Sequence, residues 1–296
     1  MGDEKNPEKD FEKETKKKIE KEPEKQTKKA PKPKKKKKKG KAGFLFILLI
    51  LLAVIGAGVY LLIPSKNRVS HNQYFGLEDD SQYGLIVNSE IVDITNGAPF
   101  EENGVWYLPF STLYYEISDA FYYEGLAMLY TDPLQTYSAA PGESFYTDSD
   151  GIKYTLTYQP CYFKDGSLCI ALDYLKLMDY SYYTVDDTMK SIWVFNDWSE
   201  QPRASLLKDT KARTQAGIKN DIVASLATGD VVTVLEQGTS WSQVQTQTGL
   251  IGYVQNKMLG EITEEAKAVP DGRPLPKYTN IAMDEMVVMG WHQVFS

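Results

Sequence analysis

Few residues of this 296-residue sequence have the types and spacing that catalysis or metal binding requires. The two histidines, His71 and His292, lie far apart, and the sequence contains no G-x-S-x-G, Walker or H-E-x-x-H motif. No cluster of His, Cys and Asp has the spacing of metal ligands. Asp284 and Glu285 are adjacent acids, which is more typical of a solvated turn than of an acid–base pair. We therefore expect neither catalysis nor a cofactor or metal from the residues present.

The two cysteines, Cys161 and Cys169, flank an Asp165-Gly166 turn. If 164–166 forms a three-residue loop with glycine in the left-handed conformation, Cys161 lies directly opposite Cys169. Outside the cytoplasm such a pair can form a disulfide. The same loop makes the pair a hydrogen-bonded site, where side chains are farther apart. A disulfide and two half-buried thiols therefore both stay open.

Aromatic side chains are the other candidates for ligand contact. Seventeen of the 20 tyrosines lie between Tyr74 and Tyr183. Their rings could stack on sugars, but adjacent tyrosines on a strand point to opposite faces, which favours packing over glycan contact. Nearer the C-terminus, Trp241 and Tyr253 are our candidate ligand-binding residues. The alternative for Trp241 is that it fills the interior of a small barrel.

A long apolar segment follows a lysine-rich N-terminus. Residues 1–41 contain 18 lysines and 9 acidic residues, whereas the whole chain has a net charge of −7. Residues 42–63, AGFLFILLILLAVIGAGVYLLI, carry no charge. As a helix rising ~1.5 Å per residue they span the ~30 Å hydrocarbon layer of a bilayer. The segment therefore predicts a single transmembrane helix.

The charges on either side of this helix predict its orientation. Lysines crowd its N-terminal side, whereas Lys66 and Arg68 alone follow closely on the other side. Positive charge stays in the cytoplasm, so we expect a cytoplasmic N-terminus in a cell membrane, with the later domains extracytoplasmic. A cleaved signal peptide is less favoured, because the basic region is long and Ile63-Pro64-Ser65 has no small-x-small cleavage site.

The lysine-rich tail has almost no apolar residues, so we expect it to be disordered. Its simplest role is to orient the helix. The alternative is weak contact with anionic lipid or nucleic acid. The lysines that would make this contact are Lys34, Lys35, Lys36, Lys37, Lys38 and Lys39.

An internal repeat organises the region after the helix. Residues 99–113, PFEENGVWYLPFSTL, align with 160–175, PCYFKDGSLCIALDYL, which places Gly104 on Gly166. Each copy predicts a β-hairpin followed by a short helix. A later strand is expected to close each copy, at 127–130 and 191–195.

The segment NSEIVDITNGAPFEENGVWYLPFSTL resembles the copper amine oxidase N-terminal-like domain of exported bacterial proteins. The resemblance covers about 85–197. It implies a non-catalytic envelope module with two repeats, and it does not imply copper.

Short strands with polar turns follow: SLLK, DIVASL, DVVTVLE, WSQVQT and LIGYV. Gly229-Asp230 before an apolar strand, then Trp241, then Gly252-Tyr253-Val254, resemble the bacterial SH3 domain. The resemblance implies a small barrel that holds peptidoglycan or its peptides. Residues 211–214, KART, depart from the LNVRSGPS segment that the family usually shows.

A proline-containing linker then leads to 281–296, IAMDEMVVMGWHQVFS, which resembles the first strand of a family 18 glycoside hydrolase. That family carries its catalytic acid in a D-x-x-D-x-D-x-E strand, which is absent here. A complete barrel of this kind takes ~250 residues. The resemblance therefore implies a truncated domain.

The fold class predicted is mainly β, or α+β. The expected segments are a disordered lysine-rich cytoplasmic tail (1–41), a transmembrane helix (42–63), a linker (66–84), a repeat-built β-rich domain (85–200), a small SH3-like β-barrel (203–262), a linker (263–280) and the truncated segment (281–296).

The resemblances imply a location in a bacterial cell membrane. The functional hypothesis is a membrane-anchored cell-envelope protein that tethers itself, or targets a partner, to peptidoglycan without catalysis. The alternative is that the chain is the targeting half of a longer family 18 glycoside hydrolase acting on wall or spore glycans. A third hypothesis gives the lysine tail the functional role and makes the outer domains sensors.

Overall fold

The computed structural model describes residues 41–95 and 97–275. The predictions for residues 1–40, which include Lys34 to Lys39, lie outside this range. So does the prediction that 281–296 begins a glycoside hydrolase barrel. All statements below refer to the described residues.

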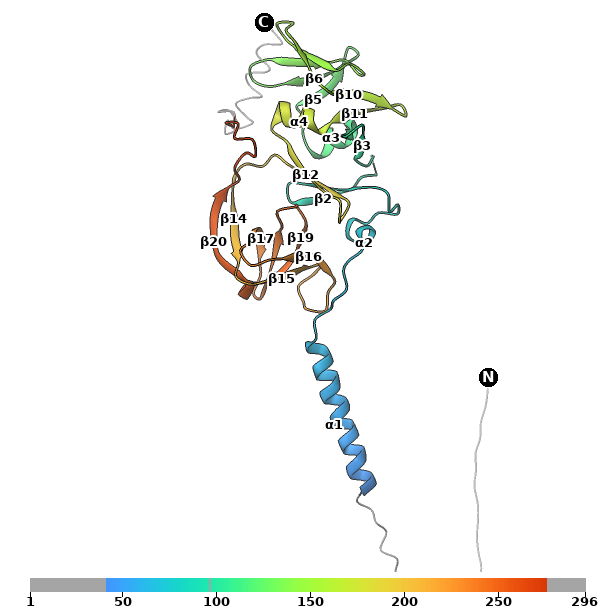
Figure 1. Cartoon of the computed structure of the whole chain (residues 1–296), viewed down its shortest axis with the longest axis vertical. Coiled ribbons are helices and arrows are strands. Elements are labelled where there is room, and N and C mark those ends of the chain that lie inside the picture. Colours follow the sequence, from blue (N-terminus) through green and yellow to red (C-terminus); the bar gives the residue numbers. More distant parts are fainter. Residues whose placement is uncertain (1–40, 96, 276–296) are drawn as a thin grey trace, which may run out of the picture. The chain divides into compact units, whose positions relative to one another are not determined.

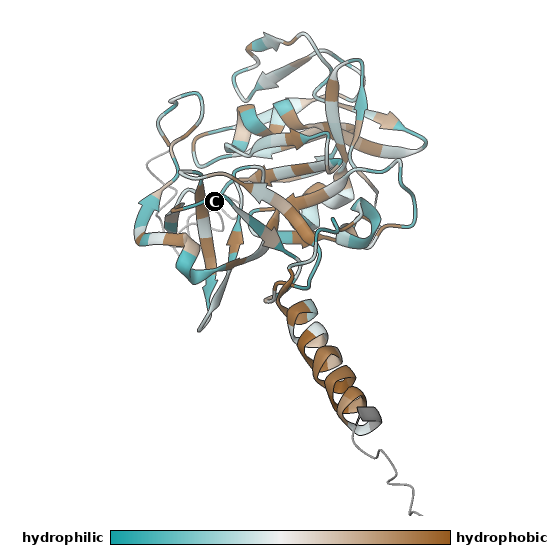
Figure 2. Cartoon of the chain, turned by 60° about the horizontal axis from the view of Figure 1, so that its bottom comes forward, coloured by the Kyte–Doolittle hydropathy of each residue, from teal (hydrophilic) through white to brown (hydrophobic). Residues whose placement is uncertain are grey.

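The first element is α1, Lys41–Leu62. Figure 2 shows hydrophobic residues along almost its whole length. Gly43–Leu62 is the one helix in the described part of the chain that is long and apolar enough to cross a membrane. None of its apolar segment is buried against protein, which suits a helix surrounded by lipid tails.

From Gly56 onward the chain forms a compact unit that is mainly β, which confirms the predicted fold class. Its sheets are shown in Figure 1. One has the order β12-β13-β1-β2, built from β1 (Gly84–Val87), β2 (Glu90–Val92), β12 (Tyr182–Asp186) and β13 (Ser191–Phe195). Another has the order β5-β6-β7-β8-β9, built from β5 (Phe121–Glu124), β6 (Ala127–Thr131), β7 (Thr136–Ala139), β8 (Phe145–Asp148) and β9 (Lys153–Thr155).

The internal repeat forms a sheet of its own with the order β10-β11-β4-β3. The first copy contains β3 (Phe100–Glu102), β4 (Val105–Pro109) and α3 (Phe110–Glu116). The second contains β10 (Cys161–Lys164), β11 (Ser167–Ala171) and α4 (Leu172–Asp179). Each copy is therefore a hairpin followed directly by a helix, as the sequence predicts.

The turn between β10 and β11 is shorter than predicted. Lys164 pairs with Ser167, which leaves a two-residue loop. Asp165 and Gly166 have φ angles of 49° and 82°, the double positive pattern of a type I′ turn. The predicted three-residue loop is therefore wrong, and the strand register shifts by one residue. Cys161 lies opposite Ile170, and Cys169 lies opposite Tyr162.

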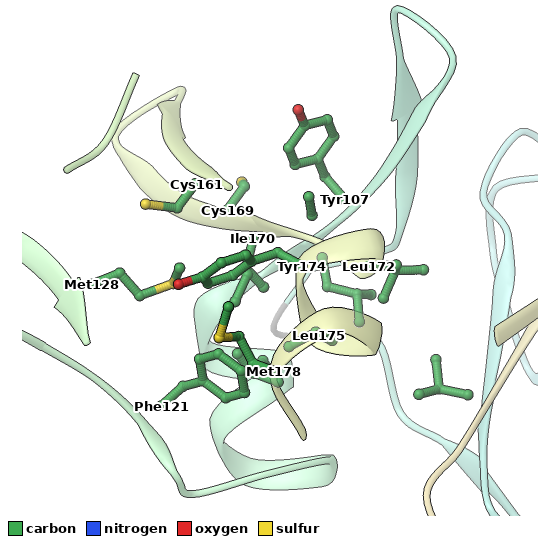
Figure 3. Close-up of a cluster of buried hydrophobic side chains, with 14 of the residues drawn as sticks. Tyr107, Phe121, Met128, Cys161, Cys169, Ile170, Leu172, Tyr174, Leu175 and Met178 are labelled. Carbon is green, nitrogen blue, oxygen red and sulfur yellow. The ribbon is translucent and has the colours of Figure 1, made fainter. Parts of the chain in front are cut away.

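The core of this region gathers around the second repeat. Tyr174 and Leu175 of α4 are fully buried, together with Ile170 of β11 and Leu108 of β4. Figure 3 shows Tyr174 at the centre of this cluster, with Met128 beside its ring. The two hairpins and both helices therefore share one apolar core.

The strands expected to close the two copies exist but lie in different sheets. β6 pairs with β5 and β7 in the five-stranded sheet. β13 instead runs parallel to β1, with Leu85 opposite Ile192. The two copies diverge here because β13 pairs with β1, a strand that precedes the repeat, whereas β6 pairs only with its neighbours in sequence.

The last sheet has seven strands in the order β16-β15-β19-β18-β17-β14-β20. They are β14 (Glu200–Leu206), β15 (Thr210–Arg213), β16 (Ile222–Leu226), β17 (Val231–Gln237), β18 (Trp241–Gln245), β19 (Ile251–Gln255) and β20 (Leu259–Ala266), with a short 3-10 turn at Asn256–Met258. Small apolar residues fill its interior, including Val232, Val244 and Val254. β20 reaches Ala266, so its strand extends into the segment predicted as a linker.

The segment predicted as a linker between helix and sheets is also structured. It contains α2, His71–Phe75, which is capped by the Ser70 hydroxyl accepting from Gln73 N. Arg68 forms a parallel bridge with Ile222 of β16. Phe75 packs in a second apolar cluster with Trp193 and Leu250, which joins the β1–β13 sheet to the seven-stranded sheet.

Candidate functional site

The outer face of the β18–β19 hairpin carries both residues singled out from the sequence. Along β18, Ser242 and Val244 point inward and are buried, so Trp241 and Gln243 point outward. Tyr253 of β19 lies directly opposite Gln243 and shares its face. The alternation of a two-faced strand therefore brings Trp241, Gln243 and Tyr253 together.

A row of side chains crosses the sheet at this level. Glu236 of β17 pairs with Gln243, Gln243 with Tyr253, and Tyr253 with Arg213 of β15. Glu236 is exposed at one end of the row. Arg213 is buried at the other end, where its guanidinium donates to Asn220 O at 2.6 Å and to Ser65 O at 3.1 Å. Arg213 is therefore engaged with backbone carbonyls, and Glu236 is the charged side chain of this row that a ligand can reach.

The loop 214–221 lies beside this face and is tied down internally. Thr214 N donates to Asp221 O at 3.0 Å and closes the base of the loop. The Asn220 amide donates to Gln215 O at 3.1 Å across it. Gly217 has a φ of 146° and sits so close that a Cβ would lie 3.0 Å from the Asn220 amide nitrogen. The loop thus forms a shaped wall next to the aromatic residues.

These parts enclose a hollow of about 330 Å³. It is lined by Ala216, Glu236, Gly238, Thr239, Ser240, Trp241, Gln243 and Tyr253. The two rings offer flat apolar faces, and the Gln243 amide can both donate and accept. Glu236 beside Trp241 is a combination that attracts an ammonium group. The hollow can therefore bind a small polar chain.

Trp241 does not fill the barrel. The residues of the interior cluster are Ala204, Leu206, Ala212, Leu226, Val232, Val234, Val244, Val254 and Leu259. Trp241 is half-buried on the outside, where it also borders a neighbouring hollow with Ile218 and Met258. The alternative interpretation of Trp241 as a plug is therefore wrong.

Cys161 and Cys169 are free thiols. Because Cys161 pairs with Ile170 rather than with Cys169, the two side chains point to opposite faces of the hairpin. The Cys161 thiol donates to Ala139 O at 3.6 Å, and the Cys169 thiol to Ser167 O at 3.6 Å. Burial raises the pKa of Cys161 to about 12, so its thiol is neutral and unreactive at physiological pH.

Within 41–95 and 97–275, no three His, Cys, Asp or Glu side chains lie close enough to hold an ion. The outer face of the β18–β19 hairpin, where both residues singled out from the sequence lie, is our candidate ligand site.

Residues 208–260 match the family described as the bacterial SH3 domain. This segment is a bacterial SH3 domain. No curated protein and no solved structure is significantly similar to the chain. The resemblances of 85–197 and 281–296 to other families therefore stay predictions.

The outer face of the SH3 domain that carries Trp241, Gln243, Tyr253 and Glu236 is called the SH3 face below. The sequence analysis singled out Trp241 and Tyr253 but not Gln243 or Glu236. Gln243 could have been found, because it is two residues from Trp241 on the same strand. Glu236 could not, because the β17–β18 register shifts between Val234 and Glu236. Such an irregularity leaves no clear mark in the sequence.

Proposed function

We propose that this protein is a membrane-anchored cell-envelope protein that holds peptidoglycan on the outer face of its SH3 domain. The observation that carries the proposal is the hollow between Trp241, Tyr253 and Glu236 on a domain whose family commonly binds cell-wall peptidoglycan. Its rings and amide suit sugar or peptide contacts. The role that we propose is tethering or targeting.

Membrane anchoring by α1 is the second part of the proposal. An uninterrupted apolar helix with unburied side chains supports it. The lysines of the N-terminal segment favour a cytoplasmic N-terminus and an extracytoplasmic SH3 domain. Lys34 to Lys39 would then lie where they can meet anionic lipid.

Anchoring and weak binding support each other physically. One small hollow offers modest affinity for a free ligand, but tethering to the membrane raises the effective concentration of the domain next to the wall. A protein of this design binds reversibly at each site and still stays at the wall.

Co-sedimentation with insoluble peptidoglycan tests the proposal. The full chain in detergent is mixed with purified wall material and pelleted, alongside Trp241→Ala and the control Tyr115→Ala. Tyr115 is an exposed aromatic on α3, so its loss removes a surface ring of similar size. We expect the native chain and Tyr115→Ala to pellet and Trp241→Ala to stay in solution. Failure of the native chain to pellet would reject the proposal.

A further inference from the structure

A second hollow lies on the other side of Tyr253, with a volume of about 350 Å³. One wall comes from the SH3 domain and includes Gln243, Gly252 and Tyr253. The opposite wall comes from outside residues 208–260: it is formed by Val69, Gln73 and Tyr74 in and beside α2, and by Ile91 of β2. The space next to the SH3 face is therefore bounded by parts of the chain that the family does not contain.

The two hollows adjoin at two shared side chains, and we call the pair of hollows the groove. Gln243 and Tyr253 line both of them, so a ligand that passes over these side chains reaches from one to the other. At one end the groove has the exposed carboxylate of Glu236 beside Trp241. At the other end it has the side chain of Ile91, which is 40% exposed, and the exposed amide of Gln73.

The wall from α2 is fixed against the barrel. The Tyr74 hydroxyl accepts from Ile251 N at 2.7 Å and donates to Ile251 O at 2.9 Å. Burial raises the pKa of Tyr74 to about 12, so the hydroxyl keeps its proton at physiological pH.

The chain before α2 adds a second attachment. Ile222 N donates to Asn67 O at 2.8 Å, and Val69 N donates to Ile222 O at 3.0 Å. Phe75, at the end of α2, packs so tightly on Gly84 that a Cβ there would lie 2.3 Å from its ring. A wall held at three places is preorganised, which lowers the entropy that ligand binding must overcome.

We propose that α2 and β2 complete the SH3 groove and that the groove takes an extended peptide with a free amino group, such as a peptide of the wall. This inference rests on the proposed function and adds the residues outside the SH3 domain that complete the groove, together with the free amino group that Glu236 selects. The amino group lies between Glu236 and Trp241, the peptide backbone meets the Gln243 and Gln73 amides, and an apolar side chain rests on Ile91.

The chemistry of the groove favours a peptide over a sugar strand. Two amide side chains spaced along a groove match the repeating donors and acceptors of a peptide backbone. An ammonium group is attracted by both a carboxylate and an indole ring. Acetylated glycan strands have no such cation.

Calorimetry with the full chain in detergent tests the inference. The probes are a synthetic wall stem peptide with a free lysine amino group, the same peptide acetylated on that amine, and soluble glycan strands without peptides. The variants are Ile91→Ala, Gln73→Ala and Glu236→Gln. The matched control is Ile152→Ala, an isoleucine that is 53% exposed outside the groove.

We expect the free peptide to bind more tightly than the acetylated one, and Glu236→Gln to remove this preference. Ile91→Ala should weaken binding about fivefold through lost apolar contact, while Ile152→Ala leaves it unchanged. The inference is overturned if Ile91→Ala and Gln73→Ala both bind the peptide with native affinity while Trp241→Ala loses binding. The binding site would then lie on the SH3 domain alone.

A preference for glycan strands over the peptide would overturn the ligand class while leaving wall binding intact. If the native chain pellets with whole wall but does not bind the free peptide, the proposed ligand class is likewise overturned. The failure of this inference is therefore distinguishable from failure of the proposed function, which would abolish pelleting itself.

Discussion

Leu108 of β4 lies directly opposite Ile170 of β11, and the two residues occupy equivalent positions in the two copies of the internal repeat. The local twofold axis of an antiparallel strand pair therefore passes between them and relates one hairpin–helix unit to the other. Both side chains are fully buried. Two copies of one motif have thus formed a single four-stranded sheet by pairing their second strands.

The first prediction concerns this central pair. Leu108→Ala should destabilise the protein by about 2–5 kcal/mol, because it leaves a cavity where the two copies meet. Leu134→Ala is the control, since Leu134 is 79% exposed and its truncation should cost little. Chemical denaturation of the full chain in detergent measures both. Equal stability of the two variants would contradict the assigned core.

The second prediction concerns the junction between the SH3 domain and the β1–β13 sheet. Gly249 has a φ of 86°, and a Cβ there would lie 2.3 Å from the Trp193 ring. Trp193 in turn donates from its indole nitrogen to Asn88 O at 2.8 Å. Gly249→Ala should therefore destabilise the fold by more than about 2 kcal/mol and change the tryptophan fluorescence.

Gly142→Ala separates the steric clash from backbone strain. Gly142 has a similar φ of 91°, but a Cβ there would meet nothing within 4 Å. The free energy of unfolding of Gly142→Ala should fall by about 1–2 kcal/mol, because alanine must adopt the left-handed conformation there. If both alanine variants unfold at the same denaturant concentration, the close approach of Gly249 to Trp193 is not real.

The third prediction concerns the thiols. In the native protein at pH 8, Cys161 should react slowly with a soluble thiol reagent, because burial excludes the reagent and raises the thiol pKa. Denaturation without reductant should release both cysteines for rapid reaction, since both are free. An absence of reactive thiols in the denatured protein would instead reveal a disulfide.

The same thiol predicts how stability depends on pH. The folded pKa of Cys161 is about 12, above its usual value of 9.0, so the unfolded chain loses this proton first as the pH rises. The stabilisation is present below about pH 9 and is lost as pH rises toward 12. Denaturant midpoints of Cys161→Ser, compared with the native chain from pH 8 to 10.5, should show a weaker decline in the variant.

Local patterns predicted much of the fold. The Asn-Gly and Asp-Gly turns, with helical spacing after them, marked both hairpin–helix units. The turn length at Asp165 was missed because two-residue and three-residue loops share the same residues. This difference of one residue in loop length determines whether Cys161 pairs with Cys169 or with Ile170.

Contacts between distant segments could not be predicted. The parallel pairing of Leu85 with Ile192 and the docking of Tyr74 on Ile251 join residues about a hundred or more positions apart. Such contacts depend on the shapes of folded surfaces, which local residue patterns do not encode. For this reason the segment 66–84 was predicted as a linker, although α2 lies within it and forms one wall of the candidate groove.

The most direct test of the account is the affinity of the full chain for soluble peptidoglycan fragments, measured for the native protein, Tyr253→Ala and Tyr253→Phe. Tyr253 lines both hollows, so any ligand on the SH3 face contacts its ring. We predict that Tyr253→Ala weakens binding about tenfold or more, while Tyr253→Phe, which keeps the ring, loses much less. Native affinity in Tyr253→Ala, with an unchanged denaturation midpoint, would contradict the claim that this face binds the wall.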